Sequence, residues 1–278
     1  MRPSLQNAIT TLQALRAGEL YRGRSRFATG APDAQSALDS VTVAWASKVP
    51  VPGTTSGVAE LFDDARARWA LERLGSVEGA RCVELGPLEG AHSYMLERAG
   101  AEHVTAVEAN RDAYLKCLVV KELLGLGRCS FLCGDVTEFL RSTDEQFDLC
   151  WCAGILYHMV EPVELLELIS TRARRLYIWT HYYDAAQLAP GQDKSRAFSA
   201  GVATRAQRAG FGYTLHRHDY GAATRFRTFW GGTRGFSNWL ELEDLVGALE
   251  HFGWRDIETK LDETHPHGPA VDLVARRG

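Results

Sequence analysis

Residues 81–90, which read Arg-Cys-Val-Glu-Leu-Gly-Pro-Leu-Glu-Gly, constrain the fold of this chain more than any other stretch. Cys82, Val83 and Leu85 predict a short buried strand, and the run from His92 to Ala99 predicts a helix just beyond the glycines. A strand, a glycine turn and a helix N-terminus bring backbone N–H groups together at one point, which favours a polar ligand. From this stretch alone, a plain glycine turn in an ordinary βαβ unit stays open as the alternative.

The spacing of the glycines excludes two common classes of ligand site. The pattern Gly86-x-x-x-Gly90 does not fit the G-x-G-x-x-G of dinucleotide-binding turns, and no G-K-[ST] follows, as a Walker phosphate loop requires. Glu84 places a carboxylate just before the turn, where a phosphate-binding site has none. We therefore expect a zwitterionic ligand; methionine fits this description, and S-adenosylmethionine fits it better.

Composition indicates one large α/β domain with additional segments, because the 278 residues are 45% hydrophobic and 24% charged. The formal net charge of -4 gives no overall attraction to DNA, RNA or an anionic membrane. No apolar run approaches the roughly 20 residues of a membrane-spanning helix, and the N-terminus lacks the apolar core of a signal peptide. We therefore expect a cytoplasmic protein. The six cysteines lack the paired spacing of a zinc site, so buried, reduced thiols are expected.

The order of predicted elements indicates an α/β, Rossmann-like, doubly wound fold with a mostly parallel sheet covered on both faces. The five predicted parallel strands are Arg81–Leu85, His103–Val107, Ser130–Cys133, Phe147–Ala153 and Arg175–Trp179. The helices between them are His92–Ala99, Asp112–Leu124, Thr137–Arg141 and Val163–Arg172. A helix over Leu242–Phe252 precedes two tail segments, Asp256–Leu261 and Ala270–Ala275, which predict a closing antiparallel hairpin. The sheet would then have seven strands.

Two regions lie outside the alternating strands and helices. Residues 1–55 carry helical apolar spacing up to about residue 20 and then irregular, proline- and glycine-containing sequence, so we expect an N-terminal helical arm that acts as a lid. A loosely ordered leader is the alternative. Residues 56–278 form the main domain, which begins with a helix from Asp63 or Asp64 to Leu74. Within it, residues 185–237 form an insert after the fifth strand, with strand-like pieces at Tyr213–Arg217 and Phe226–Trp230.

Acidic and small residues end consecutive predicted strands, at the edge where ligands bind to such sheets. Glu108 can accept hydrogen bonds from both ribose hydroxyls of an adenosine, and Asp135 can accept one from the adenine amino group. A solvated surface charge and a simple helix cap are the respective alternatives for these two carboxylates. Taken together, the strand ends predict an adenosine site formed by Glu84, Gly86, Gly90, Glu108, Ala109, Asp135, Val136 and Ala153.

Four segments resemble the successive motifs of class I S-adenosylmethionine-dependent methyltransferases: Glu84–Gly90, Val107–Asn110, Gly134–Val136 and Gly154–His158. The terminal hairpin resembles that fold too. From about residue 79 to 184 the chain is further similar to the tRNA wobble-uridine carboxymethyltransferase branch and to other bacterial methyltransferases. The resemblance implies the fold, S-adenosylmethionine as the cofactor and methyl transfer as the reaction. The first motif departs from the commoner G-x-G-x-G form, because Pro87 and Glu89 stand between its glycines.

The sequence favours plain methyl transfer to a small molecule over the tRNA activity. The net charge is slightly acidic, and the Tyr157-His158 motif is followed by Met-Val-Glu-Pro, without basic residues. No Asp/Asn-Pro-Pro-Tyr/Phe motif follows the fourth strand and no Pro-Cys nucleophile occurs, which disfavours amino methylation and pyrimidine C5 methylation. We expect O-methylation in secondary metabolism. An RNA-modifying methyl- or carboxymethyltransferase and a non-catalytic adenosine-ligand-binding module stay open, as does assembly into a homodimer.

Histidine is the residue type suited to accept the proton of an acceptor hydroxyl near neutral pH. His158 and His181 follow the fourth and fifth strands, so they are the candidate catalytic residues, with structural roles as the alternative. Aromatic planes and arginines suit an aromatic, glycosylated or anionic acceptor. The predicted acceptor-binding residues are Tyr157, Tyr182, Tyr183, Arg227, Trp230 and Trp239, although such aromatics can equally form the core of the insert. His216, His218 and Asp219 lie close together in sequence, but an exposed hairpin explains them better than a metal site.

Overall fold

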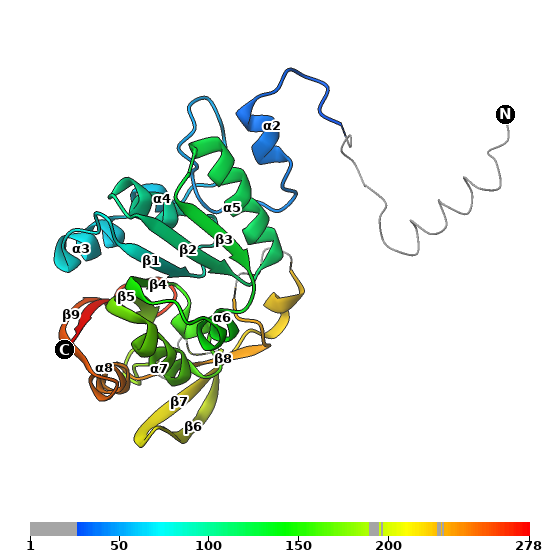
Figure 1. Cartoon of the computed structure of the whole chain (residues 1–278). Helices are drawn as coiled ribbons and strands as arrows, with labels where there is room; N and C mark the ends of the chain where they lie inside the picture. The colour runs from blue at the N-terminus through cyan, green and yellow to red at the C-terminus, as the bar shows by residue number, and fades with distance from the viewer. Residues whose placement is uncertain (1–26, 189–194, 196, 227–228, 230) are drawn as a thin grey trace, which may run out of the picture.

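The computed structural model describes residues 27–188, 195, 197–226, 229 and 231–278 of the chain (Figure 1). The predicted helix over the first 20 residues lies outside this part. The strands of the main sheet are β1 (Arg81–Leu85), β2 (His103–Glu108), β3 (Cys129–Cys133), β4 (Phe147–Ala153), β5 (Ala173–His181), β9 (Trp254–Asp262) and β10 (Ala270–Arg277). They lie in the order β3-β2-β1-β4-β5-β10-β9. The first five are parallel, and β10 is antiparallel to both β5 and β9, which confirms the predicted fold class.

Successive strand residues point to opposite faces of the sheet, and each face has its own hydrophobic core. In β4, for example, Leu149 and Trp151 belong to one core, whereas Cys150 and Cys152 belong to the other. One core is shared with α3 (Ala65–Leu74), α4 (Ala91–Arg98) and α5 (Arg111–Leu124). The other is shared with α6 (Val136–Ser142), α7 (Pro162–Arg172) and α8 (Leu242–His251). Among the described residues, no helix is long and apolar enough to cross a bilayer.

Helix caps stand at the carboxyl ends of the strands, which is the edge where a ligand would bind. The side chain of Asn110, just after β2, accepts from the N–H groups of Asp112 and Ala113 at 2.9 and 3.2 Å and so starts α5. That helix ends at Gly125, which has a φ of 65° in the left-handed region. Side-chain oxygens satisfy the free N–H groups of a helix N-terminus. A residue such as Asn110 therefore lies at the ligand edge because it caps the helix that directly follows a strand.

The insert forms a second, antiparallel sheet that the sequence predicted only in part. Its strands are β6 (Phe198–Arg208), β7 (Phe211–Asp219) and β8 (Phe236–Trp239), in the order β6-β7-β8. The prediction of a strand over Phe226–Trp230 is wrong for its described residues, since Phe226 and Phe229 lie outside any strand, after η4 (Gly221–Arg225). The register agrees with this, because Asp219 pairs with Phe236, the first residue of β8.

The described part of the N-terminal region packs on the side of the sheet that carries α5. Its helix α2 (Ala34–Asp39) contacts α5, as Figure 1 shows in blue beside green. A parallel bridge joins Ser47 to Ala59 just ahead of η1 (Leu61–Asp63). The predicted hairpin at the C-terminus is present as β9 and β10.

Candidate active site

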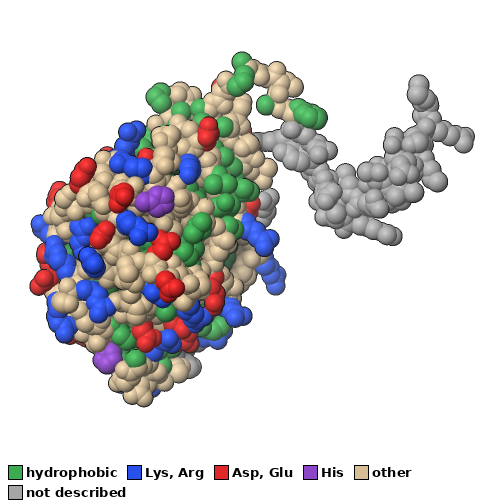
Figure 2. Space-filling view, in the orientation of Figure 1, with side chains coloured by type: hydrophobic (Ala, Val, Ile, Leu, Met, Phe, Trp, Pro, Cys, Tyr) green, Lys and Arg blue, Asp and Glu red, His purple; other side chains and the backbone are tan. Residues whose placement is uncertain are grey.

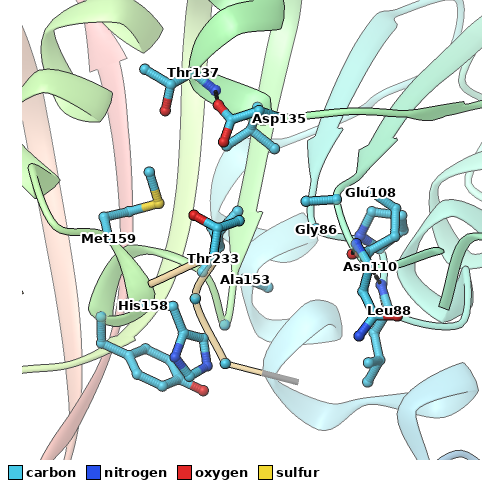
Figure 3. Close-up of a pocket in the computed structure, with 18 of the residues that line it drawn as sticks. Gly86, Leu88, Glu108, Asn110, Asp135, Thr137, Ala153, His158, Met159 and Thr233 are labelled. Carbon is cyan, nitrogen blue, oxygen red and sulfur yellow. Dashed lines mark hydrogen bonds between the residues drawn. The ribbon is translucent and has the colours of Figure 1, made fainter. Parts of the chain in front are cut away.

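A cavity of about 1180 Å³ opens at the carboxyl ends of the parallel strands, where the strand order reverses between β1 and β4. Open α/β sheets bind their ligands at this position. Pockets for one small molecule usually measure about 300–1,000 Å³, so this cavity has room for two. Figure 3 shows Glu108 and Asn110 on one side of it, Asp135 and Thr137 on another, and His158 and Met159 across from Glu108.

Glu108 is 7% exposed and lines the cavity at the end of β2. Its two carboxylate oxygens accept from the backbone N–H groups of Leu88, at 3.0 Å, and Asn110, at 2.7 Å. Burial raises the pKa of Glu108, while these amide hydrogen bonds oppose the rise. A carboxylate has about four lone-pair positions, so these backbone bonds leave Glu108 able to accept from a hydroxyl group of a ligand.

The glycine turn between β1 and α4 adopts the left-handed backbone at three residues, Gly86 (φ 71°), Leu88 (φ 55°) and Gly90 (φ 76°). Gly86 lines the cavity, and a Cβ atom there would lie 3.3 Å from Cδ1 of Ile155. Gly90 caps α4 without lining the cavity; a Cβ atom there would lie 3.1 Å from the ring of Phe131. Of the two predicted glycines, one borders the ligand space and the other allows α4 to pack on the sheet.

Glu84 lies behind the turn and not on the cavity wall, contrary to its predicted role as a direct ligand contact. It is 2% exposed, it accepts from the hydroxyl of Ser93, and its Oε1 lies 3.8 Å from Nδ1 of His92. Burial raises the pKa of Glu84. The alternation of β1 explains the position, because Glu84 points to the face that α4 covers. It therefore holds the first turn of α4, whose His92 does line the cavity.

Asp135 caps a helix and also lines the cavity. Its Oδ1 accepts from the N–H groups of Thr137 and Glu138, at 2.8 and 3.1 Å, which caps α6. The same residue is exposed and lines the cavity with Val136, and neither capping bond uses Oδ2. Ala109 and Ala153, two further predicted residues, also line the cavity.

His158 lies on the cavity wall in η2 (Leu156–His158), just after β4. Its Nδ1 is 2.7 Å from the phenolic oxygen of Tyr220, which also accepts from the N–H of Gly232 at 3.3 Å. Burial is the main cause that lowers the pKa of His158, and together with smaller effects of His218 and His181 it brings this pKa to about 3. The imidazole is therefore uncharged at neutral pH.

His181, the second candidate base, is 4% exposed and lies outside the cavity wall. Its Nδ1 is 3.1 Å from the carbonyl oxygens of both Gly268 and Pro269, so this nitrogen carries a hydrogen and donates it. The ring stacks on Trp239 at 5.1 Å, and His218 also stacks on Trp239, at 5.2 Å. Burial lowers the pKa of His181 to about 4. His181 is therefore packed among aromatic rings and does not face the cavity.

Comparison with known proteins agrees with this geometry. Residues 83–175 match the family described as "Methyltransferase domain". A tRNA U34 carboxymethyltransferase of Chromohalobacter salexigens is 29% identical over 128 residues, which cover 43% of this chain and 38% of that protein. A ubiquinone biosynthesis O-methyltransferase of Aeromonas salmonicida is 28% identical over 131 residues, covering 43% of this chain and 50% of that protein. The match thus spans half or less of the length of each curated relative.

Among solved structures, the N-terminal domain of EvdMO1, crystallised in the presence of S-adenosylhomocysteine and D-fucose, superposes with a TM-score of 0.64. It is 23% identical, and the superposition covers 88% of this chain and 95% of that one. This chain carries a class I S-adenosylmethionine-dependent methyltransferase domain. S-adenosylmethionine is the cofactor of that family, as the sequence predicted.

The cavity of the methyltransferase domain contains one of the predicted acceptor residues, Tyr157. Tyr182 and Trp239 are 4% and 3% exposed and lie behind the wall, and Tyr183 stacks on His216 at 3.5 Å. These three aromatics belong to the junction between the insert and the main sheet, whereas the alternative for them was the core of the insert. Arg227 and Trp230 lie outside the described residues.

Sequence reasoning missed several cavity residues of the methyltransferase domain. They come from two helices, from turns and from the insert: Arg66, Leu88, His92, Asn110, Met159 and Tyr220. Asn110 could have been found, because it follows Glu108 directly and precedes a helix. Arg66 could not, since only packing places its guanidinium 4.4 Å above the ring of Trp179.

Two further sequence expectations concern metal and thiols. Within the described residues, no group of three His, Cys, Asp or Glu side chains could hold a metal ion, and His216 Nε2 instead lies 2.8 Å from Glu241. Five of the six thiols are buried and Cys133 is exposed, in line with reduced, structural cysteines. Residues 27–55 do not line the cavity, and a lid role for the N-terminal region stays a prediction.

Proposed function

We propose that this methyltransferase domain transfers a methyl group from S-adenosylmethionine to a hydroxyl oxygen of a small-molecule acceptor. The observation that carries the proposal is the pairing of His158 with Tyr220 on the wall of the cavity that Glu108 and Asp135 also line. One side of this cavity suits an adenosine, and the insert supplies the opposite side. The setting that we propose with it is the cytoplasm and secondary metabolism.

The cofactor side fits S-adenosylmethionine by its donors and acceptors. Glu108 keeps lone pairs for the ribose hydroxyls, Oδ2 of Asp135 is available to the adenine amino group, and Val136 offers an apolar face for the ring. The bare backbone at Gly86 leaves room close to the turn. When bound, the cofactor supplies an electrophilic methyl group on a sulfonium that is already a good leaving group. The remaining work of the chain is to align the acceptor and exclude water.

The acceptor side fits a hydroxyl compound. When Nδ1–H of His158 donates to the Tyr220 oxygen, Nε2 carries a lone pair that can accept the hydrogen of an acceptor hydroxyl. Burial keeps this imidazole uncharged, which is the form that can accept. Phe229 and Met159 add apolar surface to the same cavity. The relative named as an O-methyltransferase and the sugar present with EvdMO1 support this acceptor class.

RNA modification is the second candidate, because one curated relative is named a tRNA U34 carboxymethyltransferase. The charge distribution favours the small molecule. The formal net charge is -4, and on the face shown in Figure 2 the described acidic and basic side chains are interspersed, without a continuous basic stripe. RNA-binding surfaces usually carry such a stripe.

The test starts with S-adenosylhomocysteine binding by calorimetry and with mass spectrometry of any ligand that copurifies. Glu108→Gln should weaken binding by about 10- to 100-fold, because each lost hydrogen bond to a charged group is worth about 1.5–3 kcal/mol. Glu138→Gln is the matched control, since Glu138 also lines the cavity but is exposed and paired with Arg141. Equal affinity of the Glu108→Gln variant and the wild type would contradict the cofactor assignment.

Turnover then distinguishes the candidate functions. We expect S-adenosylhomocysteine to form with a panel of phenols and sugars and not with tRNA. S-adenosylhomocysteine that forms with tRNA, and with none of the phenols and sugars, would establish RNA modification instead. A non-catalytic binding module would be indicated by a different result. The protein would bind S-adenosylhomocysteine with an affinity that His158→Ala does not change, and it would turn over neither the small molecules nor tRNA.

A further inference from the structure

Glu89, inside the glycine turn, is fully buried and does not line the cavity. Its Oε1 accepts from the N–H of Ala46 at 2.8 Å, and its Oε2 accepts from the N–H of Ser47 at 2.7 Å. Lys116, which is 1% exposed on α5, donates to Oε1 at 2.7 Å. The same ammonium donates to the carbonyl of Ala44 at 2.6 Å. One buried ion pair thus holds the backbone of residues 44–47.

A buried charge is tolerated only when it is paired and its remaining lone pairs or hydrogens are bonded. Here the partners that complete the pair come from a segment more than 40 residues earlier in the chain, at separations of 42 and 43 residues from Glu89. Removal of the 44–47 segment would leave both charges short of partners. The segment is therefore part of the support of the turn.

The 44–47 segment is itself fixed from the outside by residues 57–59. The N–H of Gly57 donates to the carbonyl of Ser47, and the N–H of Val58 donates to that of Ala46, both at 2.9 Å. A Cβ atom on Gly57 would lie 2.1 Å from the carbonyl oxygen of Ala46, so the two backbones lie too close for any side chain there. The amides that face Glu89 are consequently held in place.

The turn is anchored from two sides. On the cavity side, the N–H of Leu88 donates to Glu108, the proposed ribose ligand. On the far side, the neighbouring residue Glu89 is fixed by the 44–47 segment and Lys116. Leu88 holds a φ of 55°, which a non-glycine residue adopts only when its surroundings impose it. A change at Glu89 is therefore transmitted to the cavity through a single peptide unit.

We propose that Glu89 is a positioning residue that links the order of the 44–47 segment to the binding of the cofactor. The segment does not touch the cavity, yet it sets the conformation of the turn that borders it. Linkage is reciprocal, so cofactor binding should also stabilise the 44–47 backbone. The inference rests on S-adenosylmethionine as the cofactor and is independent of which acceptor is methylated.

The experiment compares Glu89→Gln with the wild type by hydrogen exchange over residues 44–47 and by S-adenosylhomocysteine calorimetry. In the wild type, S-adenosylhomocysteine should slow exchange at the amides of Ala46 and Ser47. In Glu89→Gln we expect about tenfold weaker binding and loss of that ligand-dependent protection. Glu60→Gln is the matched control, because it breaks an exposed ion pair with Lys48, next to the same segment, and should match the wild type in both measurements.

Wild-type affinity in Glu89→Gln, or exchange at 44–47 that does not respond to ligand in the wild type, would overturn the inference. If Glu89→Gln does not fold because the Lys116 ammonium has lost the Glu89 carboxylate, Glu89→Gln with Lys116→Met serves instead and should also lose the ligand-dependent protection. A wild type that does not bind S-adenosylhomocysteine would refute the cofactor assignment itself. If the wild type binds S-adenosylhomocysteine and Glu89→Gln matches it in affinity and in hydrogen exchange, only the role of Glu89 is refuted.

Discussion

The phenolic oxygen of Tyr220 lies 2.7 Å from Nδ1 of His158, although 62 residues separate the two in sequence. This contact joins the insert to the turn after β4 and closes the cavity opposite Glu108. It also fixes the orientation of an imidazole whose other nitrogen the proposed reaction uses. The insert is therefore connected to the parallel-sheet domain by a contact at the proposed reaction centre.

We expect Tyr220→Phe to lower kcat by about 10- to 100-fold while the affinity for S-adenosylhomocysteine stays within about twofold. The loss arises because the imidazole is no longer held in one orientation and tautomer, whereas positioned proton transfer contributes about 10²–10⁴-fold to rate. Steady-state kinetics and calorimetry measure the two quantities. Tyr183→Phe, in a tyrosine outside the cavity wall, is the control. A Tyr220→Phe enzyme with full kcat would argue against the proposed role of His158.

Gly86→Ala should cost stability and cofactor affinity together, whereas Gly125→Ala should cost stability alone. Both glycines have left-handed backbones, with φ of 71° and 65°, so each alanine should lower the free energy of unfolding by about 1–2 kcal/mol. Only the Cβ atom at Gly86 would meet a neighbour, Ile155 at 3.3 Å, next to the cavity. Urea unfolding and calorimetry test this pair. Equal cofactor affinity in both variants would show that the turn tolerates a side chain.

Acidification should destabilise the protein in part through His181. Burial holds its pKa at about 4, below the ordinary 6.5. Between pH 4 and pH 6.5, the unfolded chain therefore binds a proton at this residue that the folded chain does not bind. The contribution of neutral His181 to the free energy of unfolding is complete above pH 6.5 and is lost as the pH falls towards 4.

His181→Asn isolates this contribution, because an amide can still donate to the carbonyls of Gly268 and Pro269 but does not titrate. Wild-type stability minus variant stability should fall by up to about 2 kcal/mol between pH 7 and pH 5. Denaturant unfolding at a series of pH values measures the difference. A difference that is constant with pH would contradict the lowered pKa.

The local patterns of the chain predicted the parallel sheet and the cofactor edge. Short apolar runs mark strands buried on both faces, and residues that end parallel strands lie at the ligand edge, so Glu108 and Asp135 could be chosen as candidates without a structure. The same local argument failed for Glu84. It too stands near a strand end, but its face of β1 is covered by α4.

The sequence by itself determined the order along the chain of the strands and helices of the main sheet, the glycine turn and the acidic strand ends, because each of these is a property of a few adjacent residues. Only the tertiary structure decided that His158 borders the cavity while His181 is stacked behind it, that β7 pairs with β8, and that Glu89 joins Lys116 and residues 44–47. Those outcomes depend on strand register and on packing between segments tens of residues apart. A contact across such a distance is stabilised by burial and pairing in the folded chain, and no local periodicity encodes it.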